Sequence, residues 1–154
     1  AETLHIPVTC GFFPETAPPG PFDVITLWYV IEHFEEPRRV LEAVRNLLGP
    51  GGVLAFSTPS CRGISRRKSL RSFLDKSPED HWTIWNPRRC AALLRRYGFH
   101  LKKLVVTGHH PERFPLIGTL KFLYPLGMFL SRLFALGDTF EAYGVKTEDP
   151  HEDE

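Results

Sequence analysis

Two short stretches of this sequence combine imidazoles with a carboxylate, side chains that can accept a proton in catalysis or bind a metal ion. Glu32-His33 directly follows a long apolar run, and residues 109–112 read His-His-Pro-Glu. The simpler interpretation of Glu32 and His33, which we favour, is structural: they would satisfy nearby helix termini and loop amides. We expect no metal site from residues 109–112 alone, and none elsewhere.

The elements around Glu32 form a predicted β-α-β unit. Residues 22–31 are almost all apolar, β-branched or aromatic, a pattern typical of a strand buried on both faces of a parallel sheet. Pro37 then begins a helix, residues 49–52 (Gly-Pro-Gly-Gly) stop it, and residues 53–57 form a second buried strand. A strand, a crossover helix and a strand this close together predict a right-handed parallel pair. The helix carries an apolar stripe of Val40, Leu41, Val44, Leu47 and Leu48.

The second half of the chain has one clearly delimited helix. Asn86 is a predicted N-cap, Pro87 suits the first helical position, and Gly98 supplies the left-handed residue after the last turn. Strands are predicted on either side of an amphipathic helical insertion, which covers residues 114–136 and carries two prolines. These strands span residues 101–107 and residues 138–145.

The ends of the chain and one basic stretch carry weaker signals. Residues 4–10 form at best an edge strand, because Pro7 cannot donate a hydrogen bond to a neighbouring strand. Five Arg or Lys residues between positions 62 and 71 are interpreted as a solvated face, since no aromatic side chains interleave them for stacking on bases. Residues 148–154 form an acidic tail.

Composition limits the classes of function. The chain has 154 residues, 42% of them hydrophobic and 24% charged, which is ordinary for one globular domain. A net charge of +1 provides no general attraction for nucleic acid. The three cysteines lack metal-ligand spacing and fit free thiols, and no signal peptide or membrane span is visible. We therefore expect a cytoplasmic protein that has no nucleic-acid partner.

Five motifs follow one another along the β-α-β unit: Phe-Asp-Val-Ile at 22–25, Ile-Glu-His at 31–33, Pro37, Leu-Leu-Gly-Pro-Gly-Gly at 47–52 and Ser-Thr-Pro at 57–59. In this order they resemble the middle of a class I S-adenosylmethionine-dependent methyltransferase. The branch that they resemble most contains the ubiquinone-biosynthesis O-methyltransferases. The resemblance implies an α/β, Rossmann-like fold: a parallel sheet with one antiparallel strand, its N-terminal strands missing here.

The same resemblance implies two groups of cofactor-binding residues. The loop Gly11-Phe12-Phe13 would lie near the adenine, although Phe12 replaces the acid usual in the family. Trp28, Tyr29 and Val30 would lie beside the cofactor at the end of the preceding strand, with core packing as the alternative for the two aromatic residues. The glycine-rich loop and the ribose-binding acid of the family have no counterpart in this sequence. We therefore expect the isolated chain to bind S-adenosylmethionine weakly or not at all.

The resemblance also bears on catalysis. His81 matches a family position, so Glu32, His33 and His81 are the candidate catalytic residues for a small, apolar or aromatic acceptor. Quinone-biosynthesis members carry an acid three residues before the Glu-His pair, and that set can serve as a metal site. Tyr29 occupies the equivalent position here, so a metal site would be incomplete.

Residues 1–147 are thus interpreted as part of a methyltransferase domain whose whole protein methylates a small molecule. The alternative is a non-catalytic binding or assembly module. A nucleotide-sugar or dehydrogenase Rossmann domain is disfavoured by the Ile-Glu-His and Gly-Pro-Gly-Gly motifs. A homo-oligomer could form through the open sheet edge at residues 22–31 or through residues 114–136.

Overall fold

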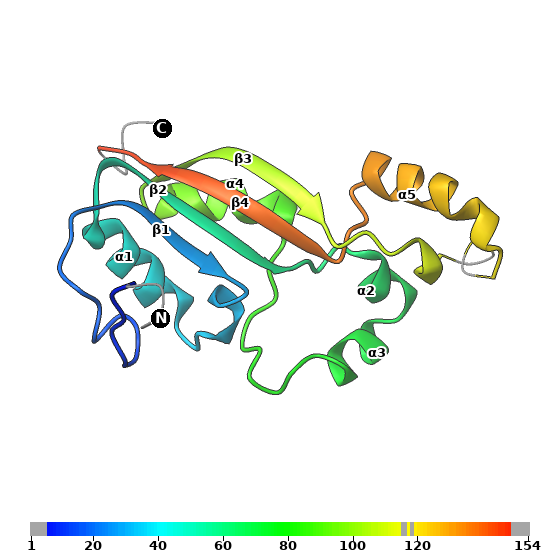
Figure 1. The fold of residues 1–154 in the computed structure, drawn as a ribbon, viewed down its shortest axis with the longest axis horizontal. Helices are drawn as coiled ribbons and strands as arrows, with labels where there is room; N and C mark the ends of the chain where they lie inside the picture. Colours follow the sequence, from blue (N-terminus) through cyan, green and yellow to red (C-terminus); the bar gives the residue numbers. More distant parts are fainter. Residues whose placement is uncertain (1–5, 115–116, 118, 149–154) are drawn as a thin grey trace.

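A mixed sheet of four strands forms the centre of the computed structural model, which describes residues 6–114, 117 and 119–148. The strands are β1 (Phe22–Trp28), β2 (Leu48–Pro59), β3 (Phe99–Thr107) and β4 (Thr139–Lys146), in the spatial order β1-β2-β4-β3 (Figure 1). β1 and β2 are parallel, whereas β4 runs antiparallel to both β2 and β3. This order confirms the predicted α/β sheet with one inserted antiparallel strand.

The crossover between β1 and β2 runs through the 3-10 turn η2 (Ile31–His33) and helix α1 (Pro37–Leu47). Val40, Leu41 and Val44 of α1 are buried, as the apolar stripe predicts. The helix ends just before residues 49–52, as predicted, but the second strand begins earlier than residue 53: α1 ends at Leu47, and β2 already pairs with β1 at Leu48. The register then shifts between Phe22 and Val24, because the glycine-rich segment is accommodated as a bulge within the strand.

Helices α1 and α4 (Pro87–Arg96) pack on the same face of the sheet and share one core with it (Figure 1). In the described part of the chain, no helix covers the opposite face, where Trp28, Lys103 and Tyr143 meet. β1 was predicted to be buried on both faces, and this is wrong: Val24 is 54% exposed and Trp28 44%. The apolar residues of β1 are thus buried only where α1 and α4 cover the sheet.

Helix α4 begins and ends as predicted. The Asn86 side chain accepts a hydrogen bond from the Arg88 amide at 3.1 Å, Pro87 opens the helix, and Gly98 takes a φ of 73° after it. Cys90 and Leu94 face the core. Burial raises the pKa of the Cys90 thiol to about 12, so this thiol is protonated near neutral pH.

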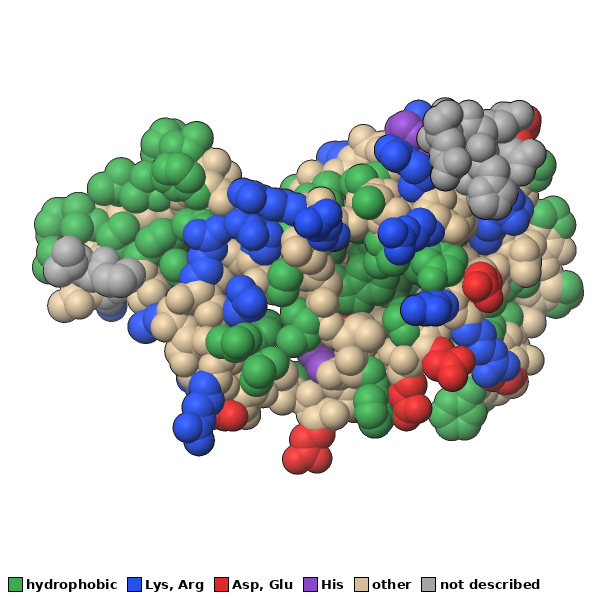
Figure 2. Space-filling model, turned by 180° about the vertical axis from the view of Figure 1, so that it is seen from behind, with side chains coloured by type: hydrophobic (Ala, Val, Ile, Leu, Met, Phe, Trp, Pro, Cys, Tyr) green, Lys and Arg blue, Asp and Glu red, His purple; other side chains and the backbone are tan. Residues whose placement is uncertain are grey.

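The insertion between β3 and β4 projects beyond the end of the sheet (Figure 1). It contains the 3-10 turns η3 (Pro111–Arg113) and η4 (Lys121–Leu123) and helix α5 (Tyr124–Leu133). Phe122, Leu126 and Phe129 are 76%, 48% and 61% exposed, which confirms the predicted apolar surface. From behind, Lys and Arg side chains gather between this apolar projection and the body of the molecule (Figure 2).

The remaining segments are short. An edge strand was predicted at residues 4–10, and this is wrong for residues 6–10, which belong to no strand and include Pro7. Residues 4 and 5 lie outside the described part of the chain. The basic stretch forms α2 (Ile64–Lys68) and α3 (Leu70–Asp75), and its cations are mostly exposed. Apart from Glu148, the predicted acidic tail lies outside the described residues. No helix among the described residues is both long and apolar enough to cross a bilayer.

Candidate functional site

The carboxyl end of β1 forms a sharp turn that leads into η2. Tyr29, the first residue after the strand, has a φ of 53°, a left-handed conformation that is rare for a large side chain. Its amide donates to the Ser57 carbonyl at 3.0 Å and to the Ser57 hydroxyl at 3.1 Å, which ties the turn to β2. The chain then turns inward and places Glu32 and His33 beside the ends of both parallel strands.

Glu32 is a buried carboxylate with an unpaired oxygen. The residue is 1% exposed, and its Oε2 has no hydrogen-bond partner. Its backbone carbonyl accepts the amides of Trp82 and Thr83 at 3.0 and 3.2 Å. The structural interpretation is therefore correct for the Glu32 backbone but does not account for its side chain, because a buried carboxylate without a partner is costly.

Two imidazoles complete a cluster with Glu32. The loop held by the Glu32 carbonyl carries His81, whose ring meets the His33 ring edge-on with centroids 4.6 Å apart. His33 Nδ1 lies 3.0 Å from Asp80 Oδ2, which orients the His33 ring. One potential ligand atom from each of Glu32, His33 and His81 lies within 4.8 Å of the others. The structure thus brings His81 together with Glu32 and His33, from which it is distant in sequence, so all three predicted catalytic residues lie in one cluster.

This cluster has two chemical capabilities. An imidazole beside a carboxylate can take a proton from a bound hydroxyl or amine. Two imidazoles and a carboxylate are also a three-ligand set of the kind that holds zinc in catalytic sites, with a fourth position for water or substrate. Among the described residues, it is the one group of three or more such side chains with this spacing. The absence of a metal here stays a prediction.

Trp28, Tyr29 and Val30, predicted to lie beside the cofactor, are accessible at the end of β1. They are 44%, 53% and 39% exposed, so none of them is part of the core. The Trp28 ring contacts only the edge of Tyr143 among described rings, at a centroid distance of 6.2 Å. These side chains are available to line a ligand site next to Glu32.

The predicted adenine-side residues occupy a separate loop. Phe13 packs against Phe34 with ring centroids 6.1 Å apart, and Glu15 pairs with Arg39 of α1 at 2.8 Å. Phe12 is 86% exposed. Among the described interactions, no hydrogen bond or ring contact joins Gly11, Phe12 or Phe13 to residues 28–30. Their role in cofactor binding stays a prediction.

The other His-rich run has local partners. His109 Nδ1 lies 2.6 Å from Ser131 Oγ, and His110 Nδ1 lies 2.9 Å from Glu112 Oε1. The pKa of the Glu112 carboxyl group is lowered, chiefly by a hydrogen bond with its own backbone. The contact between His109 and Ser131 fixes α5 to the end of β3, which is a structural role.

Sequence reasoning missed an ionic network at the start of β4, beside the carboxyl end of β2. Asp138 is 8% exposed and accepts hydrogen bonds from the Ser65 amide at 2.9 Å, the Ser65 hydroxyl at 2.6 Å and the Arg113 guanidinium. Its partners come from α2 and η3, which are far apart in sequence. No local pattern indicates such a network, and the three residues were assigned to separate elements.

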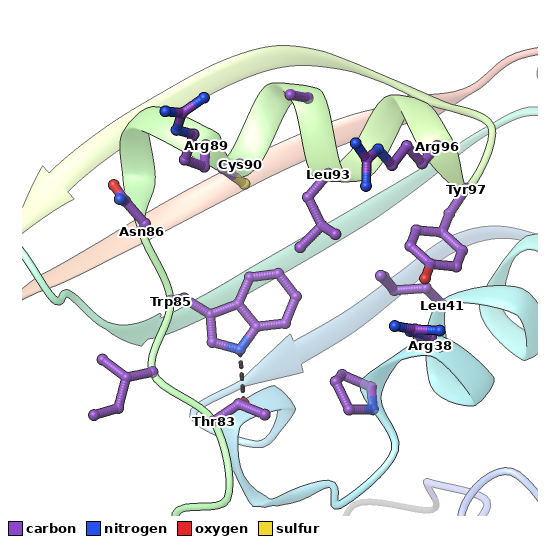
Figure 3. A pocket seen from close by; sticks show the side chains of 13 residues that line it. Arg38, Leu41, Thr83, Trp85, Asn86, Arg89, Cys90, Leu93, Arg96 and Tyr97 are labelled. Atoms are coloured by element: carbon purple, nitrogen blue, oxygen red, sulfur yellow. Dashed lines mark hydrogen bonds between the residues drawn. The ribbon is translucent and has the colours of Figure 1, made fainter.

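Two cavities of similar volume lie in different parts of the domain. One, of about 460 Å³, runs between α1 and α4 over Trp85, Leu93 and Tyr97 and contains none of the predicted site residues (Figure 3). The other, of about 470 Å³, begins at Pro59 at the carboxyl end of β2 and includes His81 in its wall. In open α/β sheets, ligands bind outside the carboxyl ends of the parallel strands. The second cavity therefore adjoins the candidate site.

The fold defines a Rossmann-like α/β domain, whose candidate site lies at the carboxyl ends of β1 and β2. Residues 10–104 match the family model described as methyltransferase domain. The chain belongs to this family.

Comparisons with individual proteins agree with this assignment. A ubiquinone biosynthesis O-methyltransferase of Burkholderia vietnamiensis is 28% identical over 106 residues, which is 64% of this chain and 46% of that protein. An S-adenosylmethionine-dependent methyltransferase structure from Thermotoga maritima has a TM-score of 0.60 at 17% identity, covering 86% of this chain and 61% of that one. A Haloferax volcanii methyltransferase solved with its activator has a TM-score of 0.56 at 14% identity, covering 84% and 56%. At these identities the structures show a shared fold alone, and the chain spans about half the length of the curated relatives it matches.

Proposed function

We propose that the whole protein carrying this domain transfers a methyl group from S-adenosylmethionine to an oxygen or nitrogen of a small acceptor. The observation that carries the proposal is the cluster at η2, in a chain that belongs to the methyltransferase domain family. Glu32 is buried with one carboxylate oxygen unpaired, and two imidazoles flank it. A buried carboxyl oxygen without a hydrogen-bond partner is typical of a functional site.

The cluster would act as a general base for the acceptor. The bound cofactor would supply an electrophilic methyl group on a positively charged sulfur. His33 or His81 would take the proton from the acceptor hydroxyl, so that its oxygen forms the new bond to carbon while the carbon–sulfur electron pair stays on sulfur. Glu32 would stabilise the imidazolium that results, and Asp80 would hold the His33 ring in place at 3.0 Å.

The cofactor would lie against Trp28, Tyr29 and Val30, with Gly11, Phe12 and Phe13 on the adenine side. The accessible aromatic side chains at the end of β1 support this placement. The isolated chain would still bind S-adenosylmethionine poorly, because neither the glycine-rich loop nor the ribose-binding acid of the family is in this sequence. By the resemblance, the loop lets the backbone approach the cofactor closely, and the acid binds the ribose hydroxyls.

The test is methyl transfer by the whole protein with labelled S-adenosylmethionine and a panel of phenols, catechols and amines. Either His33→Ala or His81→Ala, whichever removes the base, should lower the turnover rate by at least about 100-fold, the contribution of one general base. His100→Ala is the matched control, since His100 is an exposed histidine on β3. Full activity in both cluster variants would contradict the assigned roles.

A second candidate function is a non-catalytic assembly module, supported by the exposed apolar surface of α5. In this case residues such as Phe129 would contact another protein chain, and the η2 cluster would be dispensable. The Haloferax volcanii neighbour, solved with an activator, gives a precedent for a partner protein on this fold. Release of S-adenosylhomocysteine by the whole protein distinguishes the two functions, because only an enzyme produces it.

A further inference from the structure

The cavity at the end of β2 has an uneven distribution of charge. Three cationic side chains line it, Lys68, Lys76 and Arg113, against one carboxylate, Asp138. Arg113 is already bound to Asp138. Neither lysine forms an ion pair with any residue in the described part of the chain, so both ammonium groups are available to a ligand.

Hydroxyl groups line the cavity together with these two lysines. Ser69 and Ser72 line the same cavity, and the Ser69 oxygen accepts the Ser72 amide at 3.1 Å. This hydrogen bond uses the Ser69 oxygen as acceptor and leaves its proton to be donated. Hydroxyl donors beside paired ammonium groups are suited to an oxyanion, because each can donate to a different oxygen.

The rest of the wall is suited to the organic part of a ligand. Pro59, Phe73 and Pro78 contribute apolar surface, and the volume of about 470 Å³ is within the range of small-molecule sites. His81 lies in this wall and also belongs to the cluster with Glu32 and His33. A ligand held by the lysines would therefore extend toward the proposed base.

We propose that this cavity binds the methyl acceptor through an anionic group, a phosphate or a carboxylate, held by Lys68, Lys76 and the intervening serines. The acceptor is then a small organic anion whose nucleophilic end reaches His81. Its assignment as the acceptor rests on the proposed methyl transfer, whereas anion binding by the cavity does not. The chain has a net charge of only +1, so the attraction arises from this local pair of lysines.

The experiment measures binding to the chain in the absence of any methyl donor. Phenyl phosphate, benzoate and inorganic phosphate are titrated separately by calorimetry and by amide chemical shifts. We expect saturable binding of at least one aryl anion, with shifts at Lys68, Ser72, Lys76 and His81. Tighter binding of phenyl phosphate or of benzoate identifies the preferred anionic group.

Matched variants test the role of the lysines. The double change Lys68→Met and Lys76→Met should weaken binding at least about 10-fold, while Lys68→Arg with Lys76→Arg should retain it. Arg71→Met is the control, because Arg71 is outside the cavity wall and its side chain is 93% exposed. The affinity of the Arg71→Met variant for the aryl anion should stay within about twofold of that of the unmodified chain. Both lysines are exposed, so these variants are expected to fold.

Three results would overturn the inference: no binding of either aryl anion, unchanged affinity in the double Met variant, or shifts spread over the exposed arginines instead of the cavity. Failure of methyl transfer in the whole protein would be a separate outcome. Anion binding without methyl transfer leaves the cavity assigned and removes only the proposed function. Methyl transfer without anion binding supports the proposed function and removes the assignment of the cavity.

Discussion

At the residue scale, Glu32 and Asp138 are two buried carboxylates with opposite environments. Asp138 is surrounded by three hydrogen-bond donors, so its burial is compensated. Glu32 Oε2 has no partner, and its burial costs stability that must be supplied elsewhere in the fold. This contrast assigns Asp138 to the structure and is the reason why Glu32 is a candidate for a functional role.

Replacing each carboxylate by its amide should therefore change stability in opposite ways. Glu32→Gln replaces a buried carboxyl group whose Oε2 has no hydrogen-bond partner, so the free energy of unfolding should stay the same or rise by about 1 kcal/mol. Asp138→Asn weakens the contacts with Arg113 and Ser65, so the free energy of unfolding should fall by about 2 kcal/mol. Urea unfolding of the two variants and the unmodified chain measures both changes. A loss of about 2 kcal/mol in Glu32→Gln as well would assign Glu32 to the structure.

At the element scale, local signals predicted α4 well and β1 only in part. Asn86, Pro87 and Gly98 set the limits of α4 through contacts within a few residues, so the sequence alone is sufficient. The exposure of Val24 depends on which other segments cover the sheet, and the residues of β1 cannot encode that. For the same reason, the contact of His81 with His33 was predicted only through the resemblance, and the Asp138 network was not predicted.

Helix α5 tests the interpretation of the insertion. Phe129 is 61% exposed, so Phe129→Asp should change the melting temperature of the chain by no more than about 2 °C. If α5 contacts a partner chain or covers an acceptor, this variant should reduce self-association or acceptor binding. Light scattering and thermal unfolding measure the two effects.

A core substitution provides the matched control. Leu94→Ala, in the fully buried face of α4, should lower the free energy of unfolding by about 3 kcal/mol. A comparable loss of stability in Phe129→Asp would place α5 in the domain's own core.

At the scale of the whole molecule, the described part of the domain is a sheet with helices packed on one face. Helices cover one face, and the accessible residues Val24, Trp28 and Tyr29 lie along or beyond β1, the edge strand of the described sheet. The order of strands and the family were predictable because the motifs at residues 22–59 occur together in one unit. The cavity beside β2 was not predictable from the sequence, because it is formed by α2, α3 and η3, whose positions depend on tertiary packing.

The central claim is that the site at β1 is one wall of a cofactor site, and its most direct test is titration calorimetry of this chain with S-adenosylmethionine. The ribose acid and glycine loop of the family would supply two or three hydrogen bonds, each worth about 1.5–3 kcal/mol to a charged group. Since about 1.4 kcal/mol corresponds to a factor of ten in affinity, a site of about micromolar affinity would fall to about millimolar or weaker. We predict a dissociation constant in that range for residues 1–154. Tight, stoichiometric binding by a monomer of this chain would contradict the account.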